Sequence, residues 1–459
     1  MSHVVFAAPS IRRYHLLERF ARELTARGHR VTVLCVDPVD FTFWSTQGLA
    51  TTRVRAEAPG TTRAPLTELA ENDCQLAGQP ASGRHLDRKR RRLASLVPGL
   101  TRFFEQQAPD LVFFHQERRS IHRLVQFVAA ECGSRTLWTG DGLLPHTMQI
   151  SSEGIDADAS VCRRKGAEFE DIEVDESLLS AALASLIARN APAPLPRRDL
   201  VQPPLTARIR DALQAWTGGR GGGFLAALSA WQEALPTTAQ PLDNSPSMPD
   251  GPFIAVLLQD KGEDRLRLDA PDSPEAIELV HSVRGALEGI DPGIPVVAIL
   301  PQGPVPPERL AALQQLDGVL LRTYDCGIEA CLMSAAVVTI NAPGATTALL
   351  AGTPVAHLGR ALYGLPGVAL PTQIDSLAAT LEGALETDND EEALRLQARY
   401  LSWALAHGHV WCSSEQPDHN GLNGLVLATE RRLAGETLFE DPLRYQVGPA
   451  WPLTAQQPS

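Results

Sequence analysis

An acidic residue that follows a buried strand is the clearest candidate for chemistry in this sequence. Asp141 comes shortly after the apolar run Thr136–Trp138 and stands between Gly140 and Gly142. In open α/β sheets, ligands bind at the carboxyl ends of the strands, and flanking glycines let a substrate approach the backbone closely. We therefore consider Asp141 a candidate catalytic residue. The alternative is an aspartate in a tight turn.

Basic side chains near the predicted strand ends could assist this carboxylate. His146 lies close to Asp141 in the sequence, and a histidine that titrates near neutral pH could deprotonate an acceptor hydroxyl. A structural histidine is the alternative. Charge-assisted hydrogen bonds could hold a sugar carboxylate, and four basic residues that follow predicted strands are candidates for this role: His115, Arg118, Arg119 and Lys261. Surface ion pairing is the alternative for each of them.

A later segment could bind a phosphate group. The run Asn341–Thr347 opens a helix directly after the predicted strand Val337–Ile340. Free backbone N–H groups and the helix dipole at such a helix start attract anions, and a cytidylate phosphate would suit them. Four residues of this segment are candidate donor contacts: Asn341, Gly344, Ala345 and Thr346. Ordinary helix capping by Asn341 is the alternative.

These candidates need parallel sheets to hold them. The apolar run His3–Ala8, an amphipathic helix ending at Ala26 and the β-branched run Val31–Val36 predict a β-α-β unit. A glycine that ends the helix and a strand buried on both faces are typical of a doubly wound parallel sheet. Strands alternate with helices again from Phe253 onward, which predicts a second parallel sheet.

Cofactors and metals are not expected. The sequence Ala7–Ser10 replaces the G-x-G-x-x-G motif after the first strand, so NAD and FAD are excluded. His407 and His409 have no third ligand at suitable spacing.

The length of 459 residues indicates two domains of about 200 residues with a connector. We expect a Rossmann-like domain over 1–190, a Pro/Gly-rich connector with a helical piece over 191–250 and a second Rossmann-like domain over 251–390. A C-terminal helix and tail over 391–459 would then cross back to the first domain.

Composition restricts partners and location. Apolar residues make up 44% and charged residues 21% of the chain, which is typical of a globular protein. The net charge of -13 makes nucleic acid a poor partner. Seven cysteines without a C-x-x-C pair, and no run of about 18 apolar residues, predict a cytoplasmic protein. The basic run 84–92 could contact anionic lipid or a polyanionic acceptor; a solvated helix face is the alternative. Peripheral association with the inner membrane or with an assembly complex stays open.

The stretches 141–156, 257–266 and 325–359 together resemble the bacterial retaining β-Kdo transferases of capsule and O-antigen assembly. Asp141-Gly142, followed by Gly154-Ile155-Asp156, resembles an acidic element of that family and the turn after it. The segment "LLQDKGEDRL" resembles the family's strand followed by a Gln-acidic turn. The segment "DCGIEACLMSAAVVTINAPGATTALLAGTPVAHLG" resembles its Asp-Cys-x-x-Glu-Ala element, Ser/Thr-rich helix start and Gly-x-x-Val strand.

The resemblance implies an α/β fold of the GT-B type, with two facing Rossmann-like domains. It also implies transfer of a Kdo-like 2-keto sugar acid from a CMP-activated donor to a glycan or glycolipid acceptor, with retention. Independence from divalent metals is expected because no carboxylate pair with D-x-D character follows a strand of the nucleotide domain and the helix start can carry the phosphate charge. Asp141 would be the catalytic carboxylate. Gln259, Asp260 and Asp325 would be donor contacts.

Two positions depart from the family pattern. Gly140 stands where the family has an acidic residue, and Leu300-Pro301-Gln302 replaces a His-Pro element, which makes Gln302 a candidate donor contact. Two alternatives therefore stay open. One is a GT-B transferase that uses a nucleotide diphosphate sugar, and the other is a degenerate, non-catalytic transferase-like binding module.

Overall fold

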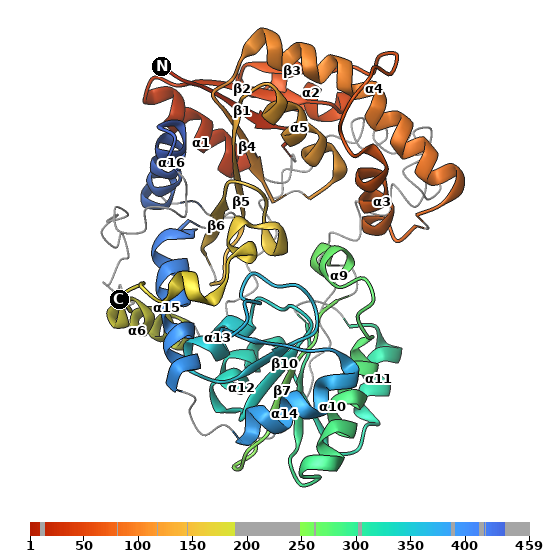
Figure 1. The fold of residues 1–459 in the computed structure, drawn as a ribbon, viewed down its shortest axis with the longest axis vertical. Helices are drawn as coiled ribbons and strands as arrows, with labels where there is room; N and C mark the ends of the chain where they lie inside the picture. The colour runs from red at the N-terminus through yellow and green to blue at the C-terminus, as the bar shows by residue number, and fades with distance from the viewer. Residues whose placement is uncertain are drawn as a thin grey trace. The chain divides into compact units, whose positions relative to one another are not determined.

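The computed structural model describes residues 1–9, 14–79, 81–116, 118–144, 146–188, 248–260, 263–301, 305–386, 391–412, 417 and 419–436. Most of the expected connector over 191–250, with its helical piece, lies outside the described residues. The chain divides into two compact units (Figure 1). Unit 1 contains the described residues of Met1–Ile155 and His407–Ser459, and unit 2 contains those of Asp156–Pro196 and Pro236–Ala406.

The described part of unit 1 is built on a seven-stranded sheet in the order β13-β6-β5-β4-β1-β2-β3. The strands are β1 (His3–Ala7), β2 (Arg30–Cys35), β3 (Thr51–Arg53), β4 (Leu111–His115), β5 (Arg135–Asp141), β6 (Met148–Ser151) and β13 (His409–Val410). The pairs among β1 to β5 are parallel. β6 runs antiparallel to β5, and β13 runs antiparallel to β6.

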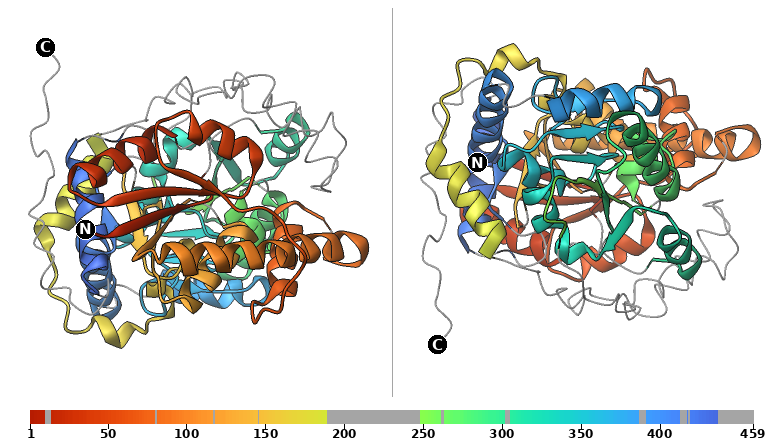
Figure 2. Two further views of the ribbon diagram at one scale, coloured as in Figure 1. Left: turned by 90° about the horizontal axis from the view of Figure 1, so that it is seen from above. Right: turned by 90° about the horizontal axis from the view of Figure 1, so that it is seen from below.

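Helices cover both faces of this sheet, which explains why β1 and β4 are buried along their whole length. The described helices of unit 1 are α1 (Tyr14–Ala26), α2 (Pro38–Ser45), α3 (Leu66–Leu76), α4 (Gly83–Gln107), α5 (Ser120–Glu131) and α16 (His419–Leu433). Residues of α1 and α16 pack on one face together with Phe6 and Phe113. Residues of α3, α4 and α5 pack on the other face, so the first strands lie between α1 and the orange helices in Figure 2.

The described part of unit 2 has a six-stranded parallel sheet in the order β12-β11-β10-β7-β8-β9. The strands are β7 (Ile254–Leu257), β8 (Val296–Ile299), β9 (Val319–Arg322), β10 (Ala336–Thr339), β11 (Val355–His357) and β12 (Leu370–Pro371). The helices are α6 (Glu176–Ala188), α9 (Asp264–Asp269), α10 (Ala276–Ile290), α11 (Pro307–Gln314), α12 (Gly327–Met333), α13 (Ala345–Leu350), α14 (Leu377–Glu386) and α15 (Glu391–His407). Alternate strand residues pack against α10 and α14, and α12 and α13 contact the same strands.

The predicted α/β class, with a mainly parallel Rossmann-like sheet in each half of the chain, is confirmed. The chain passes from unit 1 to unit 2 at Asp156 and returns to unit 1 at His407. The sequence predicted these domain boundaries at 190 and 391. Aromatic packing inside unit 2 accounts for this difference: the ring of Phe169 lies edge-on to Tyr400 and Trp403 of α15, with centroids 5.5 and 5.6 Å away.

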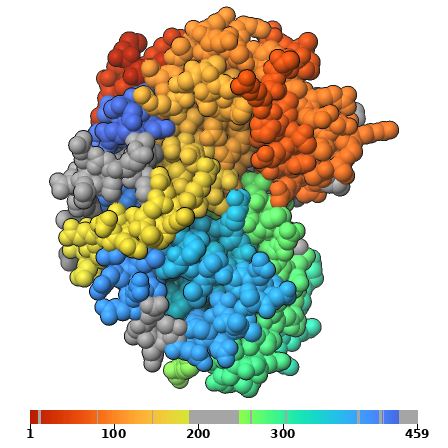
Figure 3. All heavy atoms as spheres, in the orientation of Figure 1, coloured from red at the N-terminus to blue at the C-terminus, as the bar shows by residue number. Residues whose placement is uncertain are grey.

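The basic run 84–92 forms the first turns of α4, which lies at the surface of unit 1 (orange in Figure 3). Arg84, Arg88 and Arg91 are exposed, and Arg90 forms an ion pair of 3.6 Å with Asp87. Within the described ranges, no helix combines the length and apolar character needed to cross a membrane.

Candidate active site

Asp141 is the last residue of β5, and its side chain is exposed at the carboxyl end of the parallel part of the unit 1 sheet. The side-chain amide of Gln116, which follows the neighbouring strand β4, donates a hydrogen bond to Asp141 Oδ1. Gln149 Nε2 donates to the backbone carbonyl of Asp141 at 3.0 Å. Contacts from the strands on either side of β5 therefore hold the backbone and one carboxylate oxygen of Asp141, while the side chain stays open to solvent.

The glycines beside Asp141 are required by packing within unit 1. A Cβ atom at Gly142 would lie 2.1 Å from Thr147 Oγ1 and 2.6 Å from His409 Cδ2. A Cβ atom at Gly140 would lie 3.0 Å from Gln149 Nε2 and 3.1 Å from Ile155. Protein atoms therefore occupy the space beside these glycines, where the sequence predicted that a substrate would approach the backbone. A side chain at position 140 would require Gln149 and Ile155 to move by a few tenths of an ångström.

Two residues that follow unit 1 strands adopt left-handed backbone angles although they are not glycines. Ala8 follows β1 with φ 44°, and Gln116 follows β4 with φ 53°. β1 and β4 are parallel neighbours, so both residues lie at the same edge of the sheet. Such angles cost about 1–3 kcal/mol each and cluster at functional sites. This edge of unit 1 therefore has the backbone character of a ligand site.

The other predicted residues of unit 1 lie around the same strand ends but differ in exposure. His115 ends β4 and is buried, with Nδ1 2.8 Å from Thr139 Oγ1. Arg118 is also buried, whereas Arg119 precedes α5 and is exposed. His146 is exposed in the turn between β5 and β6 and has φ 61°. Exposure favours Arg119 and His146 over His115 and Arg118 as direct ligand contacts.

Gln116 was not singled out from the sequence. It lies in the run "HQERR", where the charged neighbours carried the prediction. A glutamine carries no charge and belongs to no motif here, so the sequence does not indicate that Gln116 contacts Asp141. Its importance comes from the pairing of β4 with β5, which brings its side chain to Asp141.

In unit 2, Gln259 and Asn341 join the carboxyl ends of β7 and β10. Gln259 Nε2 donates to Asn341 Oδ1, and the backbone N–H of Asn341 donates to Gln259 Oε1, both at 2.9 Å. Asn341 Nδ2 also donates to the carbonyls of Arg265 and Arg360 at 3.3 and 3.2 Å. Both side chains are buried and engaged inside the protein, which favours a structural role over direct donor contact.

At the predicted phosphate site at the start of α13, the backbone N–H groups already make hydrogen bonds within the chain. The N–H groups of Ala345, Thr346 and Thr347 donate to the carbonyls three residues earlier, at residues 342, 343 and 344, over 3.0–3.2 Å. These three groups are therefore not free to bind an anion as the sequence argument assumed. Gly344 itself is exposed. Within the described residues, the buried hydroxyl of Thr346 has no hydrogen-bond partner.

The remaining donor candidates fall into two groups. Asp260 and Asp325 are exposed, and Asp260 Oδ1 lies 4.0 Å from Arg309 Nη1. Asp325 lies in a short 3-10 helix, Tyr324–Cys326, after β9. Lys261 and Gln302 lie outside the described residues.

No family model and no curated protein matches this sequence. Among solved structures, the chain is similar to the calicheamicin glycosyltransferase CalG4, with 16% identity, coverage of 95% of this chain and 99% of that chain, and a TM-score of 0.36. It is similar to the glycosyltransferase VinC in complex with DTDP, with 16% identity, coverage of 95% and 100%, and a TM-score of 0.33. It is also similar to KpsC of Thermosulfurimonas dismutans, a beta Kdo 2,7 transferase, with 15% identity, coverage of 72% and 89%, and a TM-score of 0.38.

Proposed function

We propose that this protein is a GT-B glycosyltransferase that transfers a Kdo-like 2-keto sugar acid from a CMP-activated donor to a glycan or glycolipid acceptor, with retention. The observation that carries the proposal is the position of Asp141. Its exposed carboxylate lies at the sheet edge where ligands bind in α/β folds. It also lies within the stretch that resembles the β-Kdo transferases.

Asp141 would act as the nucleophile of a double displacement. The carboxylate attacks the anomeric carbon of the donor sugar, and the bond from that carbon to the phosphate oxygen breaks, so CMP leaves with the bonding electron pair. The acceptor hydroxyl then displaces the carboxylate and loses its proton to a base. Two inversions give overall retention.

Two neighbours of Asp141 have supporting roles in this proposal. Gln116 is a positioning residue, because its amide holds one carboxylate oxygen and leaves the other available for attack. His146 is exposed in the turn that follows Asp141, and it is the candidate base for the acceptor proton. An imidazole suits this task because it exchanges a proton near neutral pH.

Unit 2 would bind the nucleotide. Asp260, Asp325 and Gly344 are exposed after strands β7, β9 and β10 of one parallel sheet, and the carboxyl ends of such strands form ligand crevices. A carboxylate such as that of Asp325 can accept hydrogen bonds from ribose hydroxyls or from the cytosine amino group. The proposed mechanism needs no metal, because cationic side chains of unit 2 can neutralise the single phosphate.

The experiment that tests this proposal measures nucleotide release from a panel of donors. The purified full chain is incubated with CMP-Kdo, and separately with UDP-, GDP- and dTDP-sugars, in the presence of lipopolysaccharide and capsule oligosaccharides. We expect CMP release from CMP-Kdo, and the anomeric configuration of the product, read by NMR, should match that of the donor. Release from a nucleotide diphosphate sugar alone would overturn the donor class. An inverted product would overturn the double displacement.

A non-catalytic binding module is the second candidate, and the departures at Gly140 and Leu300 favour it. Leu300 is buried in the core of unit 2, where a polar histidine would have to be accommodated. Thermal stabilisation by CMP or by an oligosaccharide, without nucleotide release from any donor, would support this candidate. Binding to the native state alone raises the unfolding midpoint even when no reaction occurs.

A further inference from the structure

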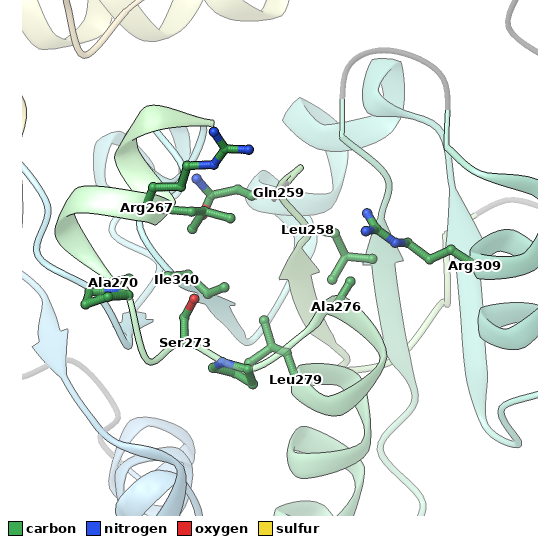
Figure 4. A pocket seen from close by; sticks show the side chains of 12 residues that line it. Leu258, Gln259, Arg267, Ala270, Ser273, Ala276, Leu279, Arg309 and Ile340 are labelled. Carbon is green, nitrogen blue, oxygen red and sulfur yellow. The ribbon is translucent and has the colours of Figure 1, made fainter. Parts of the chain in front are cut away.

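Unit 2 contains a cavity of about 170 Å³ beside the carboxyl end of its sheet (Figure 4). Its walls come from α9, the start of α10, Arg309 of α11 and the residues that follow β7 and β10. The apolar lining includes Leu258, Ala276, Leu279 and Ile340. Among the described residues that line this cavity, none is an aspartate or a glutamate.

Two arginines line this cavity from separate elements. Arg267 comes from α9 and Arg309 from α11, and Figure 4 shows the two side chains on either side of Gln259 and Leu258. Both residues are half-buried. Ser273, which also lines the cavity, adds a hydroxyl donor. Guanidinium groups match the geometry of carboxylate and phosphate oxygens, and partial burial strengthens such contacts.

The ion pair that Arg309 already makes does not prevent a ligand from binding. The partner oxygen, on Asp260, is 4.0 Å away, and the Asp260 side chain is 61% exposed. Exposed ion pairs with such geometry contribute little to stability, because water and salt screen them. An anion inside the cavity would be better shielded from water than Asp260 and could therefore compete for Arg309.

The volume restricts what can enter. The cavity volume is about 170 Å³, which is several times the minimum that admits one water. This is enough for a phosphate or for part of one sugar ring. Sites for whole drug-sized ligands measure about 300–1,000 Å³, so the cavity would bind only part of a nucleotide sugar.

We propose that this cavity is an oxyanion subsite, in which Arg267 and Arg309 together bind a carboxylate or phosphate whose adjoining carbon atoms lie on Leu258 and Ile340. The source of the anion rests on the proposed function: it is either the carboxylate of the keto sugar acid or the phosphate of cytidylate. The sequence assigned the sugar carboxylate to His115, Arg118, Arg119 and Lys261. The cavity provides a different site for it, inside unit 2.

Binding of defined anions to the full chain tests this subsite. Isothermal titration calorimetry is performed with free Kdo, CMP and inorganic phosphate, and with mannose as a neutral sugar. Arg267→Gln and Arg309→Gln each remove one charge, Ala276→Leu fills the cavity without changing charge, and Arg395→Gln on α15 is the matched control at an exposed ion pair. We expect the three cavity variants to weaken binding of at least one anion about tenfold or more, consistent with loss of a charged hydrogen bond.

The identity of the affected anion distinguishes the two sources. Weaker binding of Kdo but not of CMP assigns the carboxylate, and weaker binding of CMP and phosphate assigns the phosphate. Unchanged binding of all three anions in all three cavity variants would overturn the subsite, and so would equal weakening in Arg395→Gln. Unfolding midpoints without ligand identify any variant that fails to fold, in which case Ala276→Leu and the remaining arginine variant decide.

Failure of the subsite and failure of the proposed function give different results. If wild-type protein releases CMP from CMP-Kdo but the arginine variants keep its KM, the function stands and the subsite is wrong. If no donor reacts but anion binding still depends on Arg267 and Arg309, the subsite stands and the transferase proposal is wrong.

Discussion

The side chain of Gln259 and the backbone and side chain of Asn341 form a pair of hydrogen bonds, each 2.9 Å long, across the carboxyl ends of β7 and β10. The pair is buried, and Asn341 also donates to the carbonyls of Arg265 and Arg360. It therefore connects two central strands with α9 and with the loop after β11. Both residues were predicted as donor contacts, and the geometry gives them a supporting role.

Asn341→Ala should destabilise unit 2 by about 2–4 kcal/mol, because it leaves several buried polar groups without partners. Gln315→Ala, at an exposed position after α11, should change stability by less than about 0.5 kcal/mol. Hydrogen exchange of the β7 and β10 amides measures the effect within unit 2. Native protection combined with a large loss of CMP affinity would instead show that Asn341 contacts the donor directly.

Gly142→Ala should destabilise unit 1 by about 2 kcal/mol or more, because the new methyl group would overlap Thr147 and His409. Gly285→Ala in α10 is the matched control. No heavy atom lies within 4 Å of the Cβ position at Gly285, and alanine in a helix is favoured over glycine by about 0.5–1 kcal/mol. Urea unfolding of both variants measures the change in the free energy of unfolding, which should be a loss for Gly142→Ala and a gain for Gly285→Ala. A neutral Gly142→Ala would mean that the turn after β5 can rearrange.

The sequence was sufficient to predict the central strands of both sheets, because buried parallel strands are continuous apolar runs bounded by turn residues. The predicted run Val31–Val36 corresponds to β2, and Val296–Leu300 corresponds to β8. Peripheral elements were missed. β13 has only two residues, and α16 contains two glycines that weaken its helical signal. Their place in unit 1 depends on contacts with β6 and α1, which are distant in sequence.

The candidate site was harder to predict than the fold. Position after a strand made Asp141 a candidate, and its exposure at a sheet edge follows from topology. The contacts of Gln116 and Asn341 depend on which strands are neighbours and on the direction of each side chain. The cavity with Arg267 and Arg309 forms from three separate elements, and no local motif in the sequence marks it.

Acid should destabilise the protein partly through His407. Burial, with a smaller effect of Arg431, lowers the pKa of His407 to about 4, whereas an unfolded histidine has a pKa near 6.5. The unfolded state therefore takes up the proton first. The contribution of neutral His407 to the free energy of unfolding is therefore complete above about pH 6.5. It is lost as pH falls from 6.5 towards 4.

His407→Gln should reduce the fall of the unfolding midpoint between pH 7.5 and pH 5 by about 2–4 °C. Thermal scans at a series of pH values provide the measurement. Part of the fall should remain, because burial also lowers the pKa of His357. His281→Gln at an exposed position of α10 serves as the control. An identical pH profile for wild type and His407→Gln would show that His407 does not contribute.

Turnover should not depend on a divalent metal. The proposed leaving group carries one phosphate, and charge-assisted hydrogen bonds from side chains can stabilise its negative charge. We expect CMP release to keep its rate, within about twofold, after EDTA treatment and gel filtration, since a required metal ion would supply several kcal/mol of charge stabilisation. Loss of activity with EDTA, and recovery with magnesium or manganese, would contradict this account of the leaving group.

Asp141→Asn should abolish turnover while leaving the fold and nucleotide binding intact. Asparagine keeps the size of the side chain and can still contact Gln116, but it lacks the negative charge that attacks the anomeric carbon. We expect kcat to fall by at least about a thousandfold, with CMP-induced stabilisation unchanged, because the lost interaction forms only during reaction. Gln116→Ala should lower kcat less, by about tenfold, since it removes only a neutral hydrogen bond to the nucleophile.

Asp317→Asn, an exposed substitution in the turn before β9 of unit 2, is the control and should have wild-type kinetics. Intact mass spectrometry of wild-type protein mixed with donor alone should detect a sugar adduct, and peptide mapping should place it on Asp141. The adduct should be absent from Asp141→Asn, because an amide cannot form the glycosyl ester. Near-normal turnover in Asp141→Asn, or an adduct on another carboxylate, would show that Asp141 is a turn residue and that the nucleophile lies elsewhere.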